Sequence, residues 1–167
     1  SILISPMIVP LIITAAGMFF FYARINLVYT FTGVILAHVA LATPFVVITV
    51  TATLVGFDMN MVKAAQSLGA KPMRTFFKVI MPLILPGIIS GALFAFITSF
   101  DEVVIVMFMA SIDQLTIPKQ MWAGIRQEIS PVILCMATCL VILSIVLLTT
   151  VELLRRRAER LRGIKAR

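Results

Sequence analysis

VIMPLILPGIISGALFAFITSF, residues 79–100, is a run of 22 residues without a charged side chain. An α-helix needs about 20 apolar residues to cross the hydrocarbon core of a bilayer, so this run predicts a transmembrane helix. The composition of the chain agrees, because 61% of its residues are hydrophobic and 13% are charged, and its mean hydropathy is +1.12. These values exclude a soluble domain and indicate that lipid is the solvent.

Three other uncharged runs of similar length accompany it: residues 1–23, residues 25–57 apart from the titratable His38, and residues 129–151. The second is long enough to include a turn, which puts its helix at about 31–55. The helix over 79–100 either continues past Asp101 and Glu102 as one tilted helix or breaks there. The sequence therefore predicts an all-α, polytopic membrane helix bundle with about four transmembrane helices.

Lysine and arginine predict the orientation, because they are enriched in cytoplasmic loops. They concentrate in two segments: Lys63, Lys71, Arg74 and Lys78 in the first, and Arg155, Arg156, Arg157, Arg160, Arg162, Lys165 and Arg167 in the second. We therefore expect a cytoplasmic loop at 57–78 and a basic cytoplasmic tail at 153–167, with an even number of spans between them. The opposite side receives fewer basic residues, diluted by acids: Arg24, Lys119 and Arg126 beside Asp113 and Glu128. Nucleic acid is not an expected partner, because the basic residues flank apolar runs.

Small residues and prolines predict a packed bundle. Gly87 and Gly91 form a G-x-x-x-G pair, which is typical of close helix contact. Prolines inside or at the start of apolar helices are tolerated in lipid when neighbouring helices re-satisfy the freed carbonyls. Five prolines fall in such positions: Pro6, Pro10, Pro44, Pro82 and Pro86.

The loop that precedes the opening run carries the most specific signal, GFDMNMVKAAQSLGAKPMRTFFKVIMP at residues 56–82. Asp58 is suited to cap a short helix and Gly69 to end it at its C′ position. Pro72 is suited to the first turn of a second helix that runs into the membrane. The first helix has a narrow apolar stripe of Met61, Ala64, Ala65 and Leu68. This stripe predicts docking into a partner's groove; the alternative is that it lies on the membrane interface or on its own bundle.

The same loop resembles the signature loop of permease subunits in binding-protein-dependent ABC importers. That pattern is Glu-Ala-Ala, three residues, Gly, nine or ten residues, and Ile-x-Leu-Pro. Here it is matched by residues 63–65, Gly69 and residues 80–82, with Lys63 in place of glutamate and Met81 in place of leucine. The resemblance implies a coupling helix that inserts into a cleft of a cytoplasmic ATPase. The implied coupling residues are Lys63, Ala64, Ala65, Leu68 and Gly69. Lys63 has the opposite charge to the family's glutamate, and this reversal bears on which ATPase the permease pairs with.

The order of spans, loop and basic tail extends the resemblance over residues 1–167, as part of a methionine-permease-like transmembrane domain. It is most similar to the spermidine/putrescine branch. Members commonly have six spans, and this chain opens on Ser1 without an initiator methionine, so we expect about two preceding spans. The resemblance implies a multi-pass protein of the bacterial inner membrane with a cytoplasmic C-terminus. Its implied partners are an ATP-binding subunit, a second permease in a homo- or heterodimer, and an extracytoplasmic solute-binding protein.

Asp101 and Glu102 are the candidate substrate-pathway residues. A charge at membrane depth is costly and usually faces a cavity or a partner, and a polyamine would need fixed negative charge in a narrow pathway. The alternative is that the pair lies hydrated at the external boundary or pairs with Lys119 or Arg126. His38 is expected to hydrogen-bond to a neighbouring helix rather than to act chemically. Interfacial anchors are expected at Tyr29 and Trp122.

The expected function is that of a permease without catalytic residues, cofactor or metal. Cys135 and Cys139 lie four apart in an apolar run and lack the other ligands of a metal site. No G-x-x-x-x-G-K-[ST] loop occurs, so a partner must hydrolyse ATP. Alternatives are a permease for ferric iron, sulfate, phosphonate or thiamine, and a structural subunit without transport. A membrane enzyme is disfavoured, because no hydrolase motif is present.

Overall fold

The structure is a computed structural model that describes residues 2–127 and 130–161. These residues form helices and no strand, which confirms the all-α prediction. In chain order the elements are η1 (Ile2–Ile4), α1 (Ser5–Ile8), α2 (Leu11–Arg24), α3 (Phe31–Val55), α4 (Asn60–Ser67), α5 (Pro72–Thr75), η2 (Phe76–Ile80), α6 (Met81–Phe100), α7 (Val104–Met109), η3 (Ile112–Gln114), α8 (Ile117–Gln127) and α9 (Pro131–Leu161).

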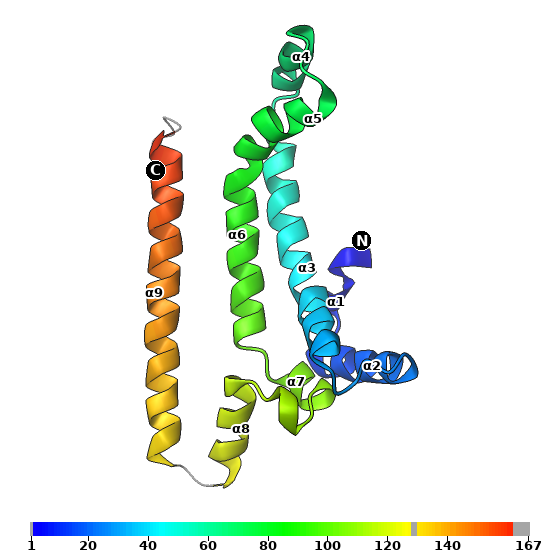
Figure 1. Cartoon of the computed structure of the whole chain (residues 1–167), viewed down its shortest axis with the longest axis vertical. Helices are drawn as coiled ribbons and strands as arrows, with labels where there is room; N and C mark the ends of the chain where they lie inside the picture. The colour runs from blue at the N-terminus through cyan, green and yellow to red at the C-terminus, as the bar shows by residue number, and fades with distance from the viewer. Residues whose placement is uncertain (1, 128–129, 162–167) are drawn as a thin grey trace.

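Three helical segments of this described part are long and apolar enough to cross a membrane: Phe31–Val55, Pro72–Phe100 and Pro131–Leu153. Figure 1 shows α3 and α6 side by side, with α9 beside α6. The shorter apolar helix α2 lies across one end of α3 instead of parallel to it (Figure 1). The predicted bundle is confirmed, with three long helices and one shorter apolar helix.

The first uncharged run is not one continuous helix. α1 ends at Ile8, and Val9 and Pro10 are extended, with ψ values of 138° and 133°. A proline disfavours the helical conformation of the residue before it and supplies no N–H to the preceding turn. Pro10 therefore separates α1 from α2.

The central span begins where the sequence predicted. Pro72 occupies the first turn of α5, and helical structure continues through η2 into α6 as far as Phe100. Within the π-helical η2 the spacing widens, so that the N–H of Met81 donates to the carbonyl of Phe76. Pro82 follows at once and has no N–H, which is a common setting for such a local widening.

α3 and α6 pack closely through the predicted small-residue face. A Cβ atom at Gly91 would lie 2.5 Å from Thr49 Oγ1 and 3.0 Å from Val46 Cα, and one at Gly87 would overlap Thr53. The rings of Phe45 and Phe94 stack with their centroids 6.3 Å apart. The G-x-x-x-G pair thus serves helix packing, as predicted.

The buried core lies at one end of this helix pair, around the short helix α7. Ile105 and Met109 of α7 are fully buried against Ala15 of α2 and against Ala37 and Leu41 of α3. α4 and α5 lie at the opposite end, where α9 also ends (Figure 1). The predicted loop and residues 153–161 of the predicted basic tail therefore share one end of the molecule. Residues 153–161 of that tail continue α9, and Glu128, Arg162, Lys165 and Arg167 lie outside the described residues.

Candidate functional site

Helix α4 is defined at its start by Asp58. The Asp58 carboxylate accepts a hydrogen bond from the N–H of Asn60 at 2.9 Å, and the Asp58 carbonyl accepts one from Met61 at 3.1 Å. A side-chain oxygen that satisfies an unpaired N–H in the first turn stabilises a helix by about 1 kcal/mol. Asp58 thus bonds the N–H of Asn60, the first residue of α4, from two positions before it, while Met59, directly before the helix, makes no side-chain capping bond.

The end of α4 depends on Gly69, which has a φ of +78°. The N–H of Gly69 donates to Gln66 at 2.9 Å, and the N–H of Ala70 donates to Ala65 at 3.0 Å. These two bonds form a Schellman motif, in which the residue with positive φ is normally glycine. The predicted helix end is confirmed.

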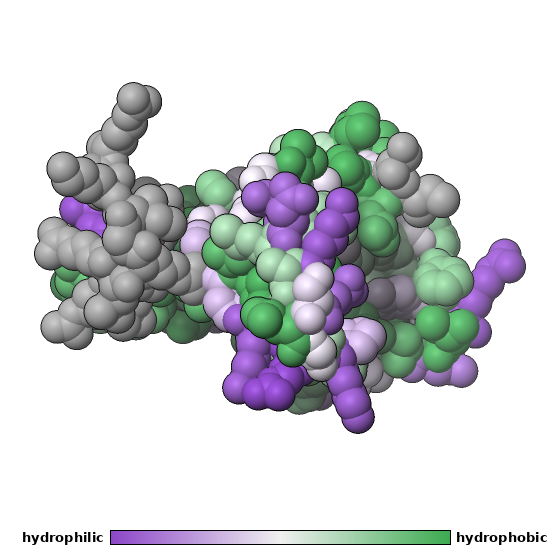
Figure 2. All heavy atoms as spheres, turned by 90° about the horizontal axis from the view of Figure 1, so that it is seen from above, coloured by the Kyte–Doolittle hydropathy of each residue, from purple (hydrophilic) through white to green (hydrophobic). Residues whose placement is uncertain are grey.

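The apolar stripe of α4 faces outward. Leu68 is 88% exposed and Met61 is 48% exposed, and Met73 of α5 is 68% exposed beside them. Figure 2 looks down on this end and shows hydrophobic and hydrophilic residues side by side on its nearest surface. The stripe is thus not covered by the described part of the bundle, which leaves a partner protein or the membrane interface to bury it.

The same end is basic. The charged residues of the loop at 57–78 are all exposed: Asp58, Lys63, Lys71, Arg74 and Lys78. Lys63, Ala64 and Leu68 are exposed and Ala65 is half-buried. A docking partner for this surface would need acidic groups near Lys63 to gain favourable Coulomb energy.

At the other end of α6, the helix breaks at the acidic pair. Asp101 terminates α6, with its N–H donating to Ile97 at 3.2 Å, and the residue is exposed. Of the two alternatives from the sequence, the broken helix is the correct one. At this break Asp101 is exposed and Glu102 is buried.

Glu102 is only 5% exposed and turns inward. Its carboxylate accepts hydrogen bonds from the N–H of Ile105, at 3.0 and 2.9 Å, and from the N–H of Val106, at 3.2 Å. These N–H groups belong to the first turn of α7, where a negative charge is favourable. Glu102 therefore caps α7.

Lys119 of α8 binds the other end of α7. Its Nζ donates to the carbonyls of Ala110, at 2.9 Å, and Val106, at 3.3 Å. Burial lowers the pKa of this amine below its ordinary value. Both contacts are with the backbone, so an ion pair between Lys119 and the acids is not what holds this lysine.

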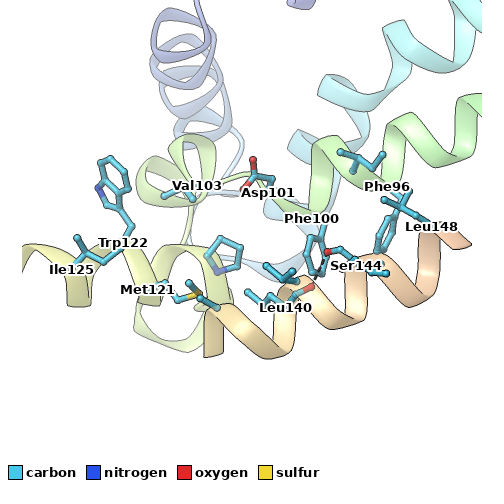
Figure 3. Close-up of a pocket in the computed structure, with 15 residues that line it drawn as sticks. Phe96, Phe100, Asp101, Val103, Met121, Trp122, Ile125, Leu140, Ser144 and Leu148 are labelled. Carbon is cyan, nitrogen blue, oxygen red and sulfur yellow. Dashed lines mark hydrogen bonds between the residues drawn. The ribbon is translucent and has the colours of Figure 1, made fainter. Parts of the chain in front are cut away.

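Two cavities meet at Asp101. One, of about 570 Å³, lies between α6, α8 and α9, and Asp101 is the one ionisable residue among its described lining (Figure 3). Phe100 and Trp122 also line it, and Asp101 lies on the side away from Leu140 and Ser144. The other, of about 490 Å³, lies between α1, α3 and α6 and is lined by both acids.

His38 links α3 to α6. Its Nδ1 lies 2.8 Å from the hydroxyl of Ser99, two residues before Asp101. The predicted hydrogen bond to a neighbouring helix is confirmed, and it ties the two spans together near the acidic turn. Tyr29 and Trp122 are both exposed, on the loop before α3 and on α8, at the end of the molecule that carries α7.

The roles of Glu102 and Lys119 as caps were missed from the sequence. A weak signal exists, since an acidic residue directly before a short apolar segment is typical of a helix start. Within the described residues, no group of three His, Cys, Asp or Glu side chains is placed to hold a metal ion. Cys135 and Cys139 are exposed free thiols on α9.

Comparison with known proteins gives a consistent result. The family model described as "Binding-protein-dependent transport system inner membrane component" matches residues 1–160. Spermidine/putrescine transport system permease protein PotC of Haemophilus influenzae is 30% identical over 151 residues, which is 90% of this chain and 59% of the relative. The PotC protein of Escherichia coli K12 is 30% identical over 150 residues, 90% of this chain and 57% of the relative. Putrescine transport system permease protein PotI of Escherichia coli K12 is 37% identical over 103 residues, 62% of this chain and 37% of the relative. The chain thus spans less than two thirds of the length of these relatives.

Proposed function

Since the chain belongs to the family of binding-protein-dependent transport system inner membrane components, we propose that it forms part of the permease subunit of an ATP-driven polyamine importer. The observation that carries this proposal is the exposed, well-capped helix α4 between two membrane-spanning helices. Its residues Lys63, Ala64, Ala65, Leu68 and Gly69 are the proposed contact with a separate ATPase. A second permease subunit and an extracytoplasmic binding protein complete the proposed assembly, with α4 and the C-terminus in the cytoplasm.

Polyamine is the proposed cargo for two reasons. The relatives named above are permeases of spermidine and putrescine systems. In addition, Asp101 lies at the edge of a cavity that Phe100 and Trp122 also line. A carboxylate attracts an ammonium group that has shed water, and aromatic faces accommodate both cations and methylene chains.

The docking step is tested by Leu68→Asp. The side chain is 88% exposed, so the change leaves the fold intact while putting a charge on the docking stripe. We expect the ATPase to be lost when the full-length permease is purified from membranes in mild detergent. The matched control is Ile112→Asp, because Ile112 is 81% exposed at the other end of the molecule. Equal ATPase recovery from both variants would contradict the docking role of α4.

The cargo step is tested by uptake of radiolabelled spermidine and putrescine into cells that carry the complete transporter. We expect Asp101→Asn to reduce uptake at least tenfold, and Asp113→Asn, at an exposed acid of the same end, to leave it unchanged. Uptake that persists with Asp101→Asn would remove Asp101 from the pathway. If wild-type cells take up no polyamine while the ATPase still co-purifies, the cargo is another solute.

A further inference from the structure

One buried residue joins the two charged groups at α7. The N–H of Val106 donates to Glu102 at 3.2 Å, and the carbonyl of Val106 accepts from Lys119 at 3.3 Å. Val106 is fully buried. Its hydrogen bond to Glu102 is buried and its hydrogen bond to Lys119 is partly buried. Glu102 and Lys119 therefore polarise the same residue from opposite sides.

The two charges also match the dipole of α7. A carboxylate at the N-terminus and an ammonium at the C-terminus are both the favourable choice, and the effect increases where water is excluded. The C-terminal end has a further contact, because the N–H of Tyr29 donates to the carbonyl of Met109 at 2.9 Å. Tyr29 has a φ of +61°, a strained conformation for a residue other than glycine, so the packing must hold this loop against α7.

This arrangement determines where Asp101 lies. Residues 101–103 link α6 to α7, and Glu102 in the middle of that link is held inward by three hydrogen bonds. Asp101 is the C-cap of α6 and stays exposed. Loss of the contact between Glu102 and α7 would free the link and let Asp101 change its position.

We propose that Glu102 and Lys119 are positioning residues that act on each other through α7 and jointly hold Asp101 at the cavity. Glu102 is then not a ligand of the cargo, although it is next in the chain to Asp101, which is the proposed ligand. Only the cargo role of Asp101 in this statement rests on the proposed function; the coupling between Glu102 and Lys119 does not.

The test places a reporter thiol at position 101, whose location the two positioning residues are proposed to control. Asp101→Cys is introduced into the full-length permease after Cys135, Cys139 and any further cysteine of that protein have been replaced by alanine. The rate of modification by a small cationic thiosulfonate is then measured in membranes. We expect Glu102→Gln and Lys119→Met each to change this rate at least fivefold. We expect the double variant to resemble either single variant, because both changes release the same helix. Lys119→Arg should retain the parent rate, since a guanidinium also donates to carbonyls.

Matched controls come from the same surface. Arg126→Met removes an exposed charge from α8, and Asp113→Asn removes one from η3, so neither should alter the rate. Unchanged reactivity in Glu102→Gln and Lys119→Met, or effects that simply multiply in the double variant, would overturn the proposal. Where Glu102→Gln fails to reach the membrane, Glu102→Asp replaces it: the side chain is one methylene shorter, the hydrogen bonds to Ile105 and Val106 are weakened, and the same change in rate is expected. The readout needs no cargo, so the coupling can be measured even in a chain that transports no polyamine.

Discussion

Single residues determine the local structure at both ends of the molecule. At one end, Gly69 takes a φ of +78° and ends α4, which leaves Leu68 on the open surface. At the other end, adjacent carboxylates have different environments, because Glu102 is buried against backbone N–H groups and Asp101 is exposed. Two carboxylates one residue apart thus lie in different environments, one bonded to buried backbone and one open to the surroundings.

The conformation of Gly69 gives a prediction at this scale. A Cβ atom at Gly69 would meet nothing within 4 Å, so Gly69→Ala tests the backbone conformation alone. An L-residue in the left-handed region costs about 1–2 kcal/mol, and we expect the end of α4 to loosen accordingly. Hydrogen exchange of the N–H groups of residues 69 and 70, which donate to the carbonyls of Gln66 and Ala65, should become faster, and ATPase recovery should fall severalfold.

Gly17→Ala is the control for that prediction. Gly17 lies inside α2 and also has open space at its Cβ position, but its φ is not in the left-handed region. Alanine favours a helix over glycine by about 1 kcal/mol, so this variant should be neutral or slightly stabilising. Equal behaviour of the two variants would mean that the conformation of Gly69 is unimportant for docking.

At the scale of elements, the packed pair α3 and α6 connects the end that carries α4 to the end that carries α7. α4 lies between these two helices in the chain, and the hydrogen bond between His38 and Ser99 joins them near Asp101. Their close contact at Gly91 leaves no room for a side chain. Two helices that pack this tightly are expected to move together, because packed interfaces have few intermediate arrangements.

Gly91→Val tests that contact. The added Cβ atom would lie 3.0 Å from the backbone of Val46, which cannot rotate away, so the helices must separate. Overpacking of this kind costs about 1–3 kcal/mol. We expect a lower midpoint of thermal unfolding in detergent than for Ala92→Val, which enlarges an exposed neighbour on the same helix. A midpoint no lower than that of the control would contradict the tight packing.

The whole molecule has two chemically different ends. One carries the basic surface of α4 and α5, and the other carries α7, α8 and the acidic turn (Figure 1). Because basic residues are retained on the cytoplasmic side, the end with α4 is expected to be cytoplasmic.

Thiol labelling tests this topology. Leu68→Cys and Ile112→Cys lie at opposite ends, and both parent side chains are highly exposed. In a background with Cys135, Cys139 and any further cysteine of the full-length protein replaced by alanine, a membrane-impermeant maleimide should label Ile112→Cys in spheroplasts. It should label Leu68→Cys only after the membrane is permeabilised. Labelling of both positions from the same side would refute the two-ended arrangement across the bilayer.

Much of the fold and part of the site followed from the sequence. The helix predicted at about 31–55 is found at Phe31–Val55, and Gly69 and Pro72 act as predicted. Asp58 bonds the first N–H of α4, although the residue directly before that helix is Met59. These features are local, since each depends on uncharged length or on hydrogen bonds between residues close in the chain. The first run departed from one long helix because Pro10, which also acts locally, outweighed its apolar composition.

The sequence by itself determined the class of the protein. It showed which segments are apolar enough to enter lipid, where these segments start and stop, and that a short helix lies between two of them. Only the tertiary structure decided the acidic site. The bond between His38 and Ser99 spans 61 positions, and that between Lys119 and Val106 spans 13. The inward turn of Glu102 requires α7 to be buried against α2 and α3. Contacts of this kind arise from packing between remote segments, and neither composition nor periodicity encodes which buried backbone group a given charge will meet.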